Sequence, residues 1–400
     1  MDRPSVALVG HEYPPYQIGG VGSYTRDLSY FLSERQVPTT VFCGRSKEPK
    51  EEYVNNHLTI VRLPFLDRPL RAYWFQLRNC SLLRNRLKHF DVVHAINPQA
   101  SAVTLLARRK GTPLVTTIHG VPIFNTKAFL NTPVSDWAFY DFMYNFLEMP
   151  IDHMLHKMCV YNSEKIVVVG QNVLRQASVA FPMMPIDNVA VIPNGIDFRR
   201  LEYLKELSSG LRPVKGDYVL FYGRLVAVKG IPYLIKSIAR LRAGFPALRL
   251  KIVGNGPLLG RLREMVAHLG LSGNVDFVGS LPNDEMMLTI MRSSFVVLPS
   301  TLEANSVSVL EAMACGKAVV AFDYSFTREM VQDFHTGLLA KGADHIDLAE
   351  KIELLLANED LRDRLAANAF QRAYHDYNWD TLVDRYVQLY LEAANDGRCS

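Results

Sequence analysis

The sequence lacks any apolar run near the about 18 residues that a helix needs to span a bilayer. Apolar runs such as IVVVG at 166–170 and AVVAF at 318–322 are far shorter. The first residues, MDRPSVALVG, place charged residues directly before a strand-like run, which is not the pattern of a signal peptide. We therefore expect a cytoplasmic protein, or one that lies on the cytoplasmic face of a membrane without crossing it.

Cysteine is scarce, and charge is nearly balanced. The five cysteines are scattered, odd in number and without C-x-x-C spacing. This favours a reducing compartment and argues against a structural zinc site. Because the net charge is only +4, we do not expect the chain as a whole to bind nucleic acid.

The 400 residues predict two domains of roughly 200 residues each. Short β-branched runs recur, each followed by a segment with helical periodicity. They lie at 5–10, 39–44, 57–63, 91–96, 113–120, 165–170 and 189–195 in the first half, and at 218–225, 248–254, 275–281, 295–300 and 318–323 in the second. Near-continuous apolar strands alternating with helices are typical of parallel sheets covered on both faces. The fold class predicted is therefore α/β, with two Rossmann-like doubly wound domains.

The expected boundaries are 1–200 for the first domain, 201–378 for the second and 379–400 for a final helix. The polar stretch from Phe198 to Asp217 is the best linker candidate. The final helix has one apolar stripe at i, i+3, i+4 and i+7 spacing, formed by Trp379, Leu382, Val383, Tyr386, Val387 and Tyr390. Such a stripe must pack on something, and the first domain is the candidate.

Ligands of open α/β sheets bind beyond the carboxyl ends of the strands. After the first strand, Gly19, Gly20 and Gly22 run directly into a predicted helix, where glycines let backbone N–H groups approach an anion. A flexible turn is an equally good interpretation of the glycines alone. His119 follows the strand PLVTTI, at the mouth of the same sheet, whereas His94 lies inside a strand and is interpreted as a core histidine.

In the second half, Arg224 ends a strand and Lys229 lies just before a helix. Two cations at a helix start suit a diphosphate, although two solvated surface cations are the alternative. The segment LKIVGNGPLLG has Gly254 and Gly256 but a third glycine, Gly260, one position too late for a dinucleotide fingerprint. A Rossmann dehydrogenase is disfavoured, while a tight strand-to-helix turn facing a nucleotide remains open.

Two acids, Glu303 and Glu311, lie eight positions apart in LEANSVSVLEAMACGK. We expect a helix to start near Asn305 or Ser306 and to stop at Gly316. Glu303 would then lie in the loop, and Glu311 on a helix face shared with Ser308, Ala312 and Cys315. The opposite face, Val307, Leu310, Met313 and Ala314, is the one predicted to be buried. One acid could hold a ribose diol, the amides of Asn305 to Val307 a phosphate, and the other acid a further polyol. The alternative is that Glu303 only caps the helix from the loop and that Glu311 is an exposed helical glutamate.

In this order and spacing, the segments resemble the retaining glycosyltransferases of family 4, which have the two-domain GT-B fold. The resemblance covers nearly the whole chain. It is carried by GGVG near residue 20, HG at 119–120, NGID at 194–197, GRLVAVKG, VGNGP, the E-x7-E of EANSVSVLE followed by AMACGKAVV, and NWD before the last helix.

The resemblance implies a nucleotide-sugar donor in the cleft between the domains and a final helix that crosses back to the first domain. Arg224 and Lys229 would contact the diphosphate, and Glu311 the ribose. Glu303, with the amides around Asn305 and Ser306, would hold the donor sugar. Gly19, Gly20 and His119 would close over that sugar, and the backbone of Leu281 would contact the base. We also expect the donor to contact the backbone amide of Val307 at the helix start and the turn that contains Gly254 and Gly256.

The resemblance also implies retention of the anomeric configuration, with the leaving diphosphate helping to deprotonate the acceptor. The sequence contains no D-x-D triplet, the metal–diphosphate clamp of the other glycosyltransferase fold. We therefore expect a metal-independent hexosyltransferase without a cofactor. One departure concerns the family's E-G-F-G, which here reads Glu303-Ala304-Asn305-Ser306. The backbone role survives this change, but the choice of donor sugar does not follow from it.

The acceptor is a hydroxyl group, with lipid-linked and polysaccharide glycans as candidates. From Pro64 to Phe90 there are six lysines or arginines and one acid, with Tyr73, Trp74 and Phe75 among them, and Trp137 to Met149 is dense in aromatics. These segments could bind an anionic membrane or receive a lipid-linked acceptor. A solvated basic face with ordinary core aromatics is an equally good interpretation. A sugar-nucleotide epimerase and a catalytically silent sugar-nucleotide-binding protein are the competing functions. UDP, GDP and ADP donors are not distinguished.

Overall fold

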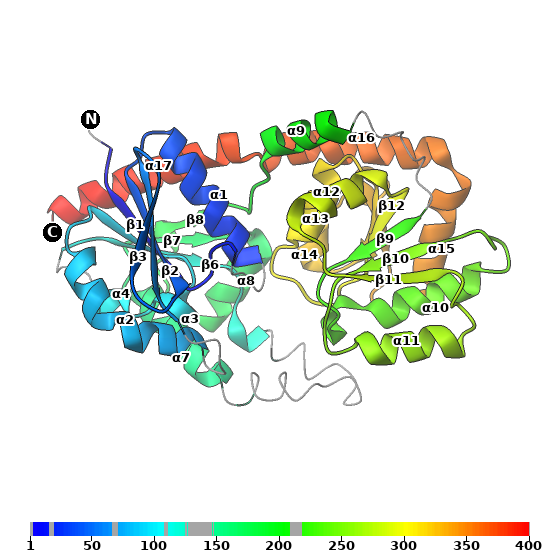
Figure 1. Cartoon of the computed structure of the whole chain (residues 1–400), viewed down its shortest axis with the longest axis horizontal. Helices are drawn as coiled ribbons and strands as arrows, with labels where there is room; N and C mark the ends of the chain where they lie inside the picture. Colours follow the sequence, from blue (N-terminus) through cyan, green and yellow to red (C-terminus); the bar gives the residue numbers. More distant parts are fainter. Residues whose placement is uncertain are drawn as a thin grey trace. The chain divides into compact units, whose positions relative to one another are not determined.

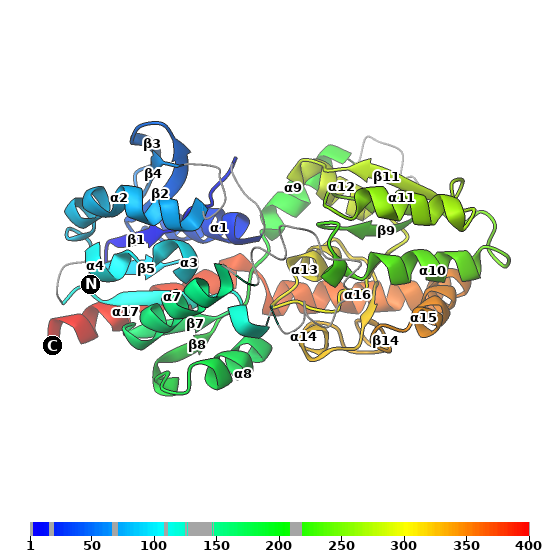
Figure 2. The same ribbon diagram turned by 90° about the horizontal axis from the view of Figure 1, so that it is seen from below.

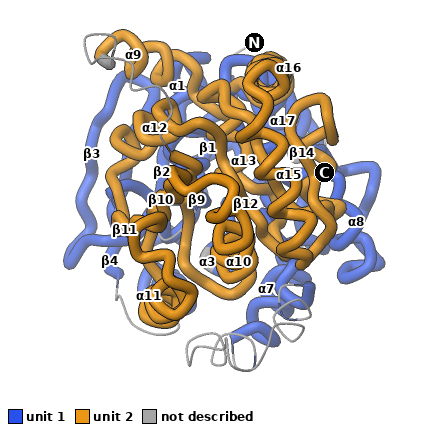
Figure 3. The backbone as a smooth tube through the Cα atoms, turned by 90° about the vertical axis from the view of Figure 1, so that its right-hand side faces the viewer, with its two compact units in different colours: residues 1–126, 143–195, 379–400 blue, residues 127–142, 196–378 orange. Residues whose placement is uncertain are grey.

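The computed structural model describes residues 3–15, 20–65, 71–107, 111–124, 126, 146, 148–208 and 218–399. They form two compact units (Figure 1, Figure 3). Unit 1 contains the described parts of 1–126, 143–195 and 379–400, and unit 2 contains, among the described residues, 196–378. Each unit is built on its own sheet, as the predicted α/β class requires.

The described part of unit 1 has an eight-stranded sheet in the order β3-β4-β2-β1-β5-β6-β7-β8. Its strands are β1 (Val6–Val9), β2 (Thr39–Ser46), β3 (Lys50–Asn55), β4 (Leu58–Pro64), β5 (Val92–Ala95), β6 (Leu114–Ile118), β7 (Lys165–Val168) and β8 (Val189–Val191). Only the pairing of β3 with β4 is antiparallel among these strands. The hairpin strand β3 was not predicted, because KEEYVN is charged and largely exposed and has no apolar period.

Helices cover both faces of this sheet (Figure 2). They are α1 (Gly20–Glu34), α2 (Arg71–Leu87), α3 (Pro98–Ser101), α4 (Thr104–Ala107), α7 (Met149–Tyr161), α8 (Gln171–Ala180) and α17 (Trp379–Cys399), with a short 3-10 turn at Ile186–Asn188. Alternate residues of β1 divide between two cores: Val6 and Leu8 lie with α1 and α17, and Ala7 and Val9 lie with α2. The buried strand therefore has apolar residues at every position, as a sheet covered on both faces requires.

The C-terminal helix α17 packs within unit 1, against α1 and against β5 and β6. Its predicted stripe is buried at Trp379, Leu382, Val383, Tyr386 and Tyr390. Val387 is only partly buried. At the edge of this contact, Arg35, directly after α1, donates a hydrogen bond of 2.7 Å to Asp384.

The described part of unit 2 has a six-stranded parallel sheet in the order β11-β10-β9-β12-β13-β14. Its strands are β9 (Val219–Tyr222), β10 (Leu250–Val253), β11 (Val275–Gly279), β12 (Phe295–Leu298), β13 (Val319–Phe322) and β14 (Gly337–Ala340). Its helices are α9 (Phe198–Ser208), α10 (Ile231–Leu241), α11 (Leu259–His268), α12 (Asn283–Arg292), α13 (Val307–Ala314), α14 (Ser325–Arg328), α15 (His345–Ala357) and α16 (Glu359–Asp376).

The linker prediction was wrong in its first half. Residues 198–208 form the helix α9, whose Phe198, Leu201 and Leu204 join the core of unit 2. Residues 209–217 lie outside the described residues. Among the described helices, none is long and apolar enough to cross a membrane.

Candidate functional site

The predicted donor residues of unit 2 all follow strands β9 to β12. These four strands are neighbours and parallel, so their carboxyl ends lie at one edge of the sheet. Arg224 and Lys229 follow β9, Gly254 and Gly256 follow β10, and Leu281 follows β11. Glu303, Asn305 and Ser306 lie between β12 and α13. This edge is where open α/β sheets bind ligands.

The loop after β9 is fixed to the loop after β12. The backbone N–H of Thr301 donates to the Val228 carbonyl at 2.8 Å. Gly230 has φ 66°, and a Cβ placed there would lie 1.9 Å from the Pro299 carbonyl oxygen. Only glycine fits a left-handed position so close to another backbone. The contact holds Lys229, in the 3-10 turn Ala227–Lys229, beside the segment that carries Glu303.

Lys229 and Glu303 form an ion pair in which both side chains are largely shielded from water. The same carboxylate oxygen of Glu303 accepts a hydrogen bond of 3.0 Å from the Ser300 hydroxyl. Arg224 is exposed. Within the described ranges, Arg224 makes no ion pair, whereas the Lys229 ammonium has a carboxylate partner in Glu303.

The helix α13 starts at Val307, in the predicted region, with Ser306 as its N-cap in extended conformation. Ser306 makes no side-chain capping bond to the described residues. The first amides of α13 therefore donate no capping bond to the Ser306 hydroxyl oxygen, and the helix dipole gives this end a partial positive charge. An anion or a sugar hydroxyl could accept hydrogen bonds there.

The predicted faces of α13 are only partly correct. Ala312 and Cys315 are buried, although they were assigned to the open face, and Val307 is only half-buried. The reason is that α13 packs against both β12 and α16. Glu311 remains partly exposed, and burial of the nearby Tyr222, followed by the charge of Glu311, raises the pKa of the Tyr222 phenol.

Gly254 and Gly256 pack against the backbone that carries Arg224. A Cβ at Gly254 would lie 1.9 Å from the Gly223 carbonyl oxygen, and one at Gly256 would lie 2.4 Å from that of Leu225. Leu225 N–H also donates to the Asn255 carbonyl at 2.9 Å. In this structure the two glycines hold the Arg224 loop in place, and any contact with a nucleotide stays a prediction.

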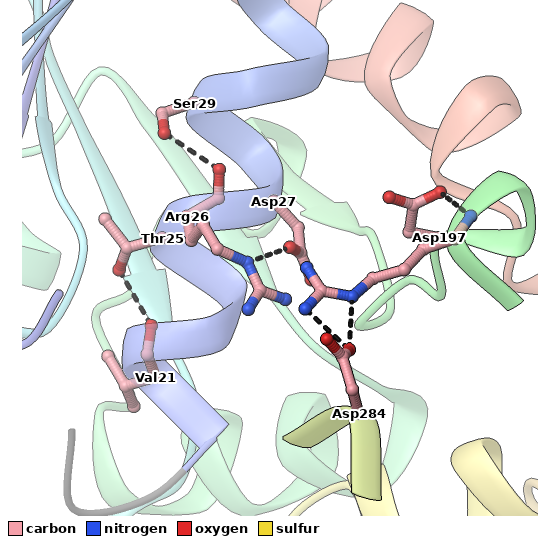
Figure 4. Close-up of polar contacts among 8 residues, drawn as sticks. Val21, Thr25, Arg26, Asp27, Ser29, Asp197 and Asp284 are labelled. Atoms are coloured by element: carbon pink, nitrogen blue, oxygen red, sulfur yellow. Dashed lines mark hydrogen bonds and ion pairs between the residues drawn. The ribbon is translucent and has the colours of Figure 1, made fainter. Parts of the chain in front are cut away.

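Leu281 is half-buried, just before α12. An ion pair ties the start of α12 to α9: Arg200 donates to one oxygen of Asp284 at 2.9 Å from Nε and 2.7 Å from the terminal nitrogen (Figure 4). Asp197 accepts a hydrogen bond of 3.1 Å from the Arg200 backbone. The ion pair joins α9 to the first turn of α12, which directly follows the loop that contains Leu281.

In unit 1, Gly20 is the first residue of α1, and Gly19 lies outside the described residues. His119 follows β6 directly. Its Nε2 is buried and has no hydrogen-bond partner among the described residues. Burial lowers the pKa of His119 to about 4, so the imidazole is neutral at pH 7. His94 is a core histidine, as predicted, with both ring nitrogens hydrogen-bonded.

Some polar residues of unit 1 were not singled out from the sequence. His11 and Glu12 follow β1 and are buried. His11 Nε2 lies 3.6 Å from Glu12 Oε1. Asp152 and His156, one turn apart in α7, are also buried, and His156 Nδ1 lies 3.2 Å from Asp152 Oδ1. The position of HEYPPY after the first strand was a signal for the first pair. The described residues contain no cluster of three or more His, Cys, Asp or Glu side chains that could hold a metal ion.

Family models match both halves of the chain. The model of Glycosyltransferase Family 4 matches residues 18–200, and that of Glycosyl transferases group 1 matches residues 205–372. The chain belongs to glycosyltransferase family 4. The predicted family is therefore confirmed, and with it glycosyltransferase activity.

A curated relative of this glycosyltransferase is the glycogen synthase of Mycobacterium tuberculosis, 25% identical over 98% of this chain and 96% of that protein. Sucrose-phosphate synthase from Thermosynechococcus elongatus has a similar structure, with TM-score 0.79, 20% identity and coverage of 98% and 99%. HepE of Anabaena, in complex with UDP and glucose, has TM-score 0.69, 18% identity and coverage of 96% and 98%. These structures confirm the GT-B fold.

Proposed function

We propose that the protein transfers a hexose from a nucleoside diphosphate sugar to a hydroxyl acceptor, with retention of the anomeric configuration. The observation that carries this proposal is the edge of unit 2, where Arg224, Lys229, Glu303, Glu311 and the start of α13 follow neighbouring strands. The complex of HepE with UDP and glucose supports a donor of this class.

The cations are the proposed diphosphate site. Arg224 is exposed, and Lys229 would gain a second anionic partner besides Glu303 when a diphosphate binds. Charge-assisted hydrogen bonds of this kind are about twice as strong as neutral ones. With two cations and a helix start to stabilise the leaving group, the reaction needs no metal ion and no cofactor. Addition of a chelator is expected to leave the transfer rate unchanged.

The two acids are the proposed hydroxyl-binding groups. Glu311 would accept hydrogen bonds from the ribose diol, since a carboxylate offers several acceptor sites. Glu303 and the amides of Asn305, Ser306 and Val307 would hold the donor sugar. Leu281, Gly254 and Gly256 would border the nucleoside. From unit 1, Gly19, Gly20 and His119 would act on the transferred sugar, and the leaving diphosphate would accept the acceptor proton.

Calorimetric titration with UDP-, GDP- and ADP-sugars tests the donor site. One donor class is expected to bind the wild type, and Arg224→Ala and Glu311→Ala are expected to weaken that binding. Arg240→Ala and Glu353→Ala are the matched controls, because both residues are exposed on other helices of unit 2. Binding that the first two substitutions leave unchanged would contradict the site.

Product analysis separates the proposed reaction from its alternatives. Transfer of the sugar supports the proposal, a changed epimer of the donor would indicate an epimerase, and donor binding without any product would indicate a silent binding protein. The anomeric configuration of the transferred sugar, read by NMR, tests retention.

We also propose that the acceptor is lipid-linked and that unit 1 lies on an anionic membrane. Exposed apolar side chains occur at helical spacing on two helices: Trp74 and Leu77 on α2, and Ile151, Met154 and Met158 on α7. Exposed cations accompany them: Arg78 and Arg84 lie on α2, Lys88 directly follows α2, and Lys157 lies on α7. Apolar residues rimmed by cations suit an anionic bilayer surface. The aromatic segment 137–149 lies mostly outside the described residues.

Co-sedimentation with vesicles tests the membrane proposal. Vesicles with anionic lipids should bind the protein, and neutral vesicles should bind it less. Leu77→Ser with Met154→Ser should reduce binding, while Val179→Ser, another exposed apolar residue of unit 1, should not. Equal recovery with anionic and neutral vesicles would contradict the charge argument.

A further inference from the structure

A buried circuit of hydrogen bonds begins and ends on α17. The Tyr386 hydroxyl lies 2.7 Å from the Tyr24 hydroxyl of α1, which lies 3.3 Å from the Thr117 hydroxyl of β6. Thr117 lies 2.7 Å from His94 Nε2 on β5, and His94 Nδ1 lies 2.7 Å from the Tyr390 hydroxyl. Tyr386 and Tyr390 are one helical turn apart. We refer to these five residues as the tyrosine–histidine circuit.

All members of the circuit are almost completely buried. Burial lowers the pKa of His94 to about 3 and raises the pKa of Tyr24 to about 12, so the imidazole is neutral and the phenol keeps its proton at pH 7. Burial likewise raises the pKa of Tyr386 and Tyr390. A neutral imidazole donates from one nitrogen and accepts at the other, so each bond of the circuit can be satisfied. Buried polar networks that are satisfied in this way hold their members rigidly.

The circuit touches His119 through Tyr24. The two rings meet edge-on, with centroids 4.6 Å apart and an interplanar angle of 83°. Thr117, another member, lies two residues before His119 at the end of the same strand. His119 is therefore held by its own strand and by a tyrosine whose hydroxyl is fixed from α17.

The orientation of the His119 ring matters because one of its nitrogens is available to a ligand. Its Nε2 is buried and has no hydrogen-bond partner among the described residues. A buried polar atom without a partner is costly, of order 1–3 kcal/mol, unless a ligand satisfies it. The direction in which this nitrogen points depends on the plane of the ring, which a hydrogen bond to the backbone of Ile96 and the edge-on contact with Tyr24 both constrain.

We propose that Tyr24 and Tyr386 are positioning residues for His119, so that the C-terminal helix sets the orientation of this imidazole toward the sugar. The inference rests on the proposed function insofar as His119 acts on the transferred sugar. The other account of the circuit is that it only anchors α17 to unit 1. The two accounts differ in what the two tyrosines of α17 should do.

The decisive comparison is Tyr386→Phe against Tyr390→Phe. Each variant removes one buried hydroxyl from α17 and retains the ring, so anchoring alone predicts similar effects. Positioning predicts asymmetry, because Tyr386 bonds directly to Tyr24 whereas Tyr390 bonds to His94. We expect Tyr386→Phe to lower kcat about five-fold, the equivalent of about one hydrogen bond, with the donor KM unchanged. Tyr390→Phe should lower kcat less than Tyr386→Phe does, although the two variants should have similar Tm values.

The ring nitrogen signals of His119 in NMR supply a measurement that needs no turnover. They are assigned by comparison with His119→Gln, and they should move in Tyr386→Phe more than in Tyr390→Phe. Tyr218→Phe, which removes a hydroxyl bonded to the Thr289 carbonyl in unit 2, should leave them in place. If Tyr386→Phe does not fold, Tyr24→Phe takes its place, because it keeps the ring beside His119 but removes the same hydrogen bond.

Unchanged His119 signals in Tyr386→Phe, or equal losses of kcat in the two α17 variants, would overturn the inference. Failure of the wild type to transfer any sugar would instead overturn the proposed function. A shift of the His119 signals in Tyr386→Phe would still support the coupling between α17 and His119 in that case.

Discussion

Lys229 and Glu303 form an ion pair although they lie 74 positions apart in the sequence. They meet because β9 and β12 are neighbours in a parallel sheet, which brings the loops after both strands to one edge. The hydrogen bond between Thr301 and Val228 and the contact of Gly230 with Pro299 fix the two loops to each other. The pair therefore belongs to a rigid part of the candidate donor site.

Replacement of Lys229 should weaken binding of diphosphates more than that of monophosphates. Lys229→Met removes one charge-assisted hydrogen bond, worth about 1.5–3 kcal/mol, so affinity for the nucleoside diphosphate should fall about 10- to 100-fold. Lys236→Met, an exposed lysine of α10, is the control. The measurement is calorimetry with the nucleoside diphosphate and monophosphate of the donor. An equal loss for both nucleotides would contradict a diphosphate contact.

Replacement of Glu311 should abolish discrimination between ribose and deoxyribose. If the carboxylate accepts hydrogen bonds from the ribose diol, the wild type should bind the ribonucleotide more tightly than its 2′-deoxy form. Glu311→Leu removes both acceptor oxygens at nearly the same size, so the two nucleotides should bind it with nearly equal affinity. Glu353→Leu should discriminate as the wild type does. Discrimination that survives in Glu311→Leu would remove Glu311 from the ribose site.

Replacement of Gly230 should destabilise unit 2. A non-glycine residue in left-handed conformation costs roughly 1–2 kcal/mol, and the Cβ would also lie 1.9 Å from the Pro299 carbonyl oxygen. We expect Gly230→Ala to lose more than about 2 kcal/mol in urea unfolding and to weaken donor binding. Gly244→Ala is the control, since its Cβ would lie 3.9 Å from the Leu241 carbonyl oxygen, an ordinary van der Waals contact. Equal stability of the two variants would mean that the loop adapts.

The sequence could predict the edge residues because strand ends follow from a local pattern. Apolar runs located the strands, and the parallel sheet then placed Arg224, Lys229 and Glu303 at one edge without any knowledge of their side-chain contacts. The faces of α13 were misjudged at Ala312 and Cys315, because their burial depends on α16, a helix that packs from elsewhere in the chain. The strand β14, GLLA, was not predicted because its apolar run is too short to stand out in the sequence.

The tyrosine–histidine circuit could not be predicted at all. Tyr24 and Tyr386 are 362 positions apart, and the stripe of α17 indicates only that Tyr386 is buried. Neither residue type nor spacing says which hydroxyls will meet once α17 packs on α1. Long-range polar contacts of this kind depend on the finished packing and carry no local signal.

Stability should fall as the pH drops below about 6.5, because the fold keeps His94 and His119 neutral. Burial lowers the pKa of His94 to about 3 and that of His119 to about 4, from 6.5 in the unfolded chain. Between these values the unfolded chain binds protons that the folded protein does not, so acid favours unfolding.

Each of the two histidines should contribute about 1.4 kcal/mol of lost stability per pH unit in that window. His94→Gln should therefore lessen the slope of unfolding free energy against pH by about that amount between pH 6 and pH 4.5, even though it lowers stability at pH 7 by disturbing the circuit. His119→Gln should lessen the slope similarly, with a smaller loss at pH 7, because its Nε2 has no hydrogen-bond partner among the described residues. Urea unfolding at a series of pH values measures both quantities. A slope equal to that of the wild type in both variants would show that the two imidazoles take up protons without unfolding, and that the fold does not keep them neutral.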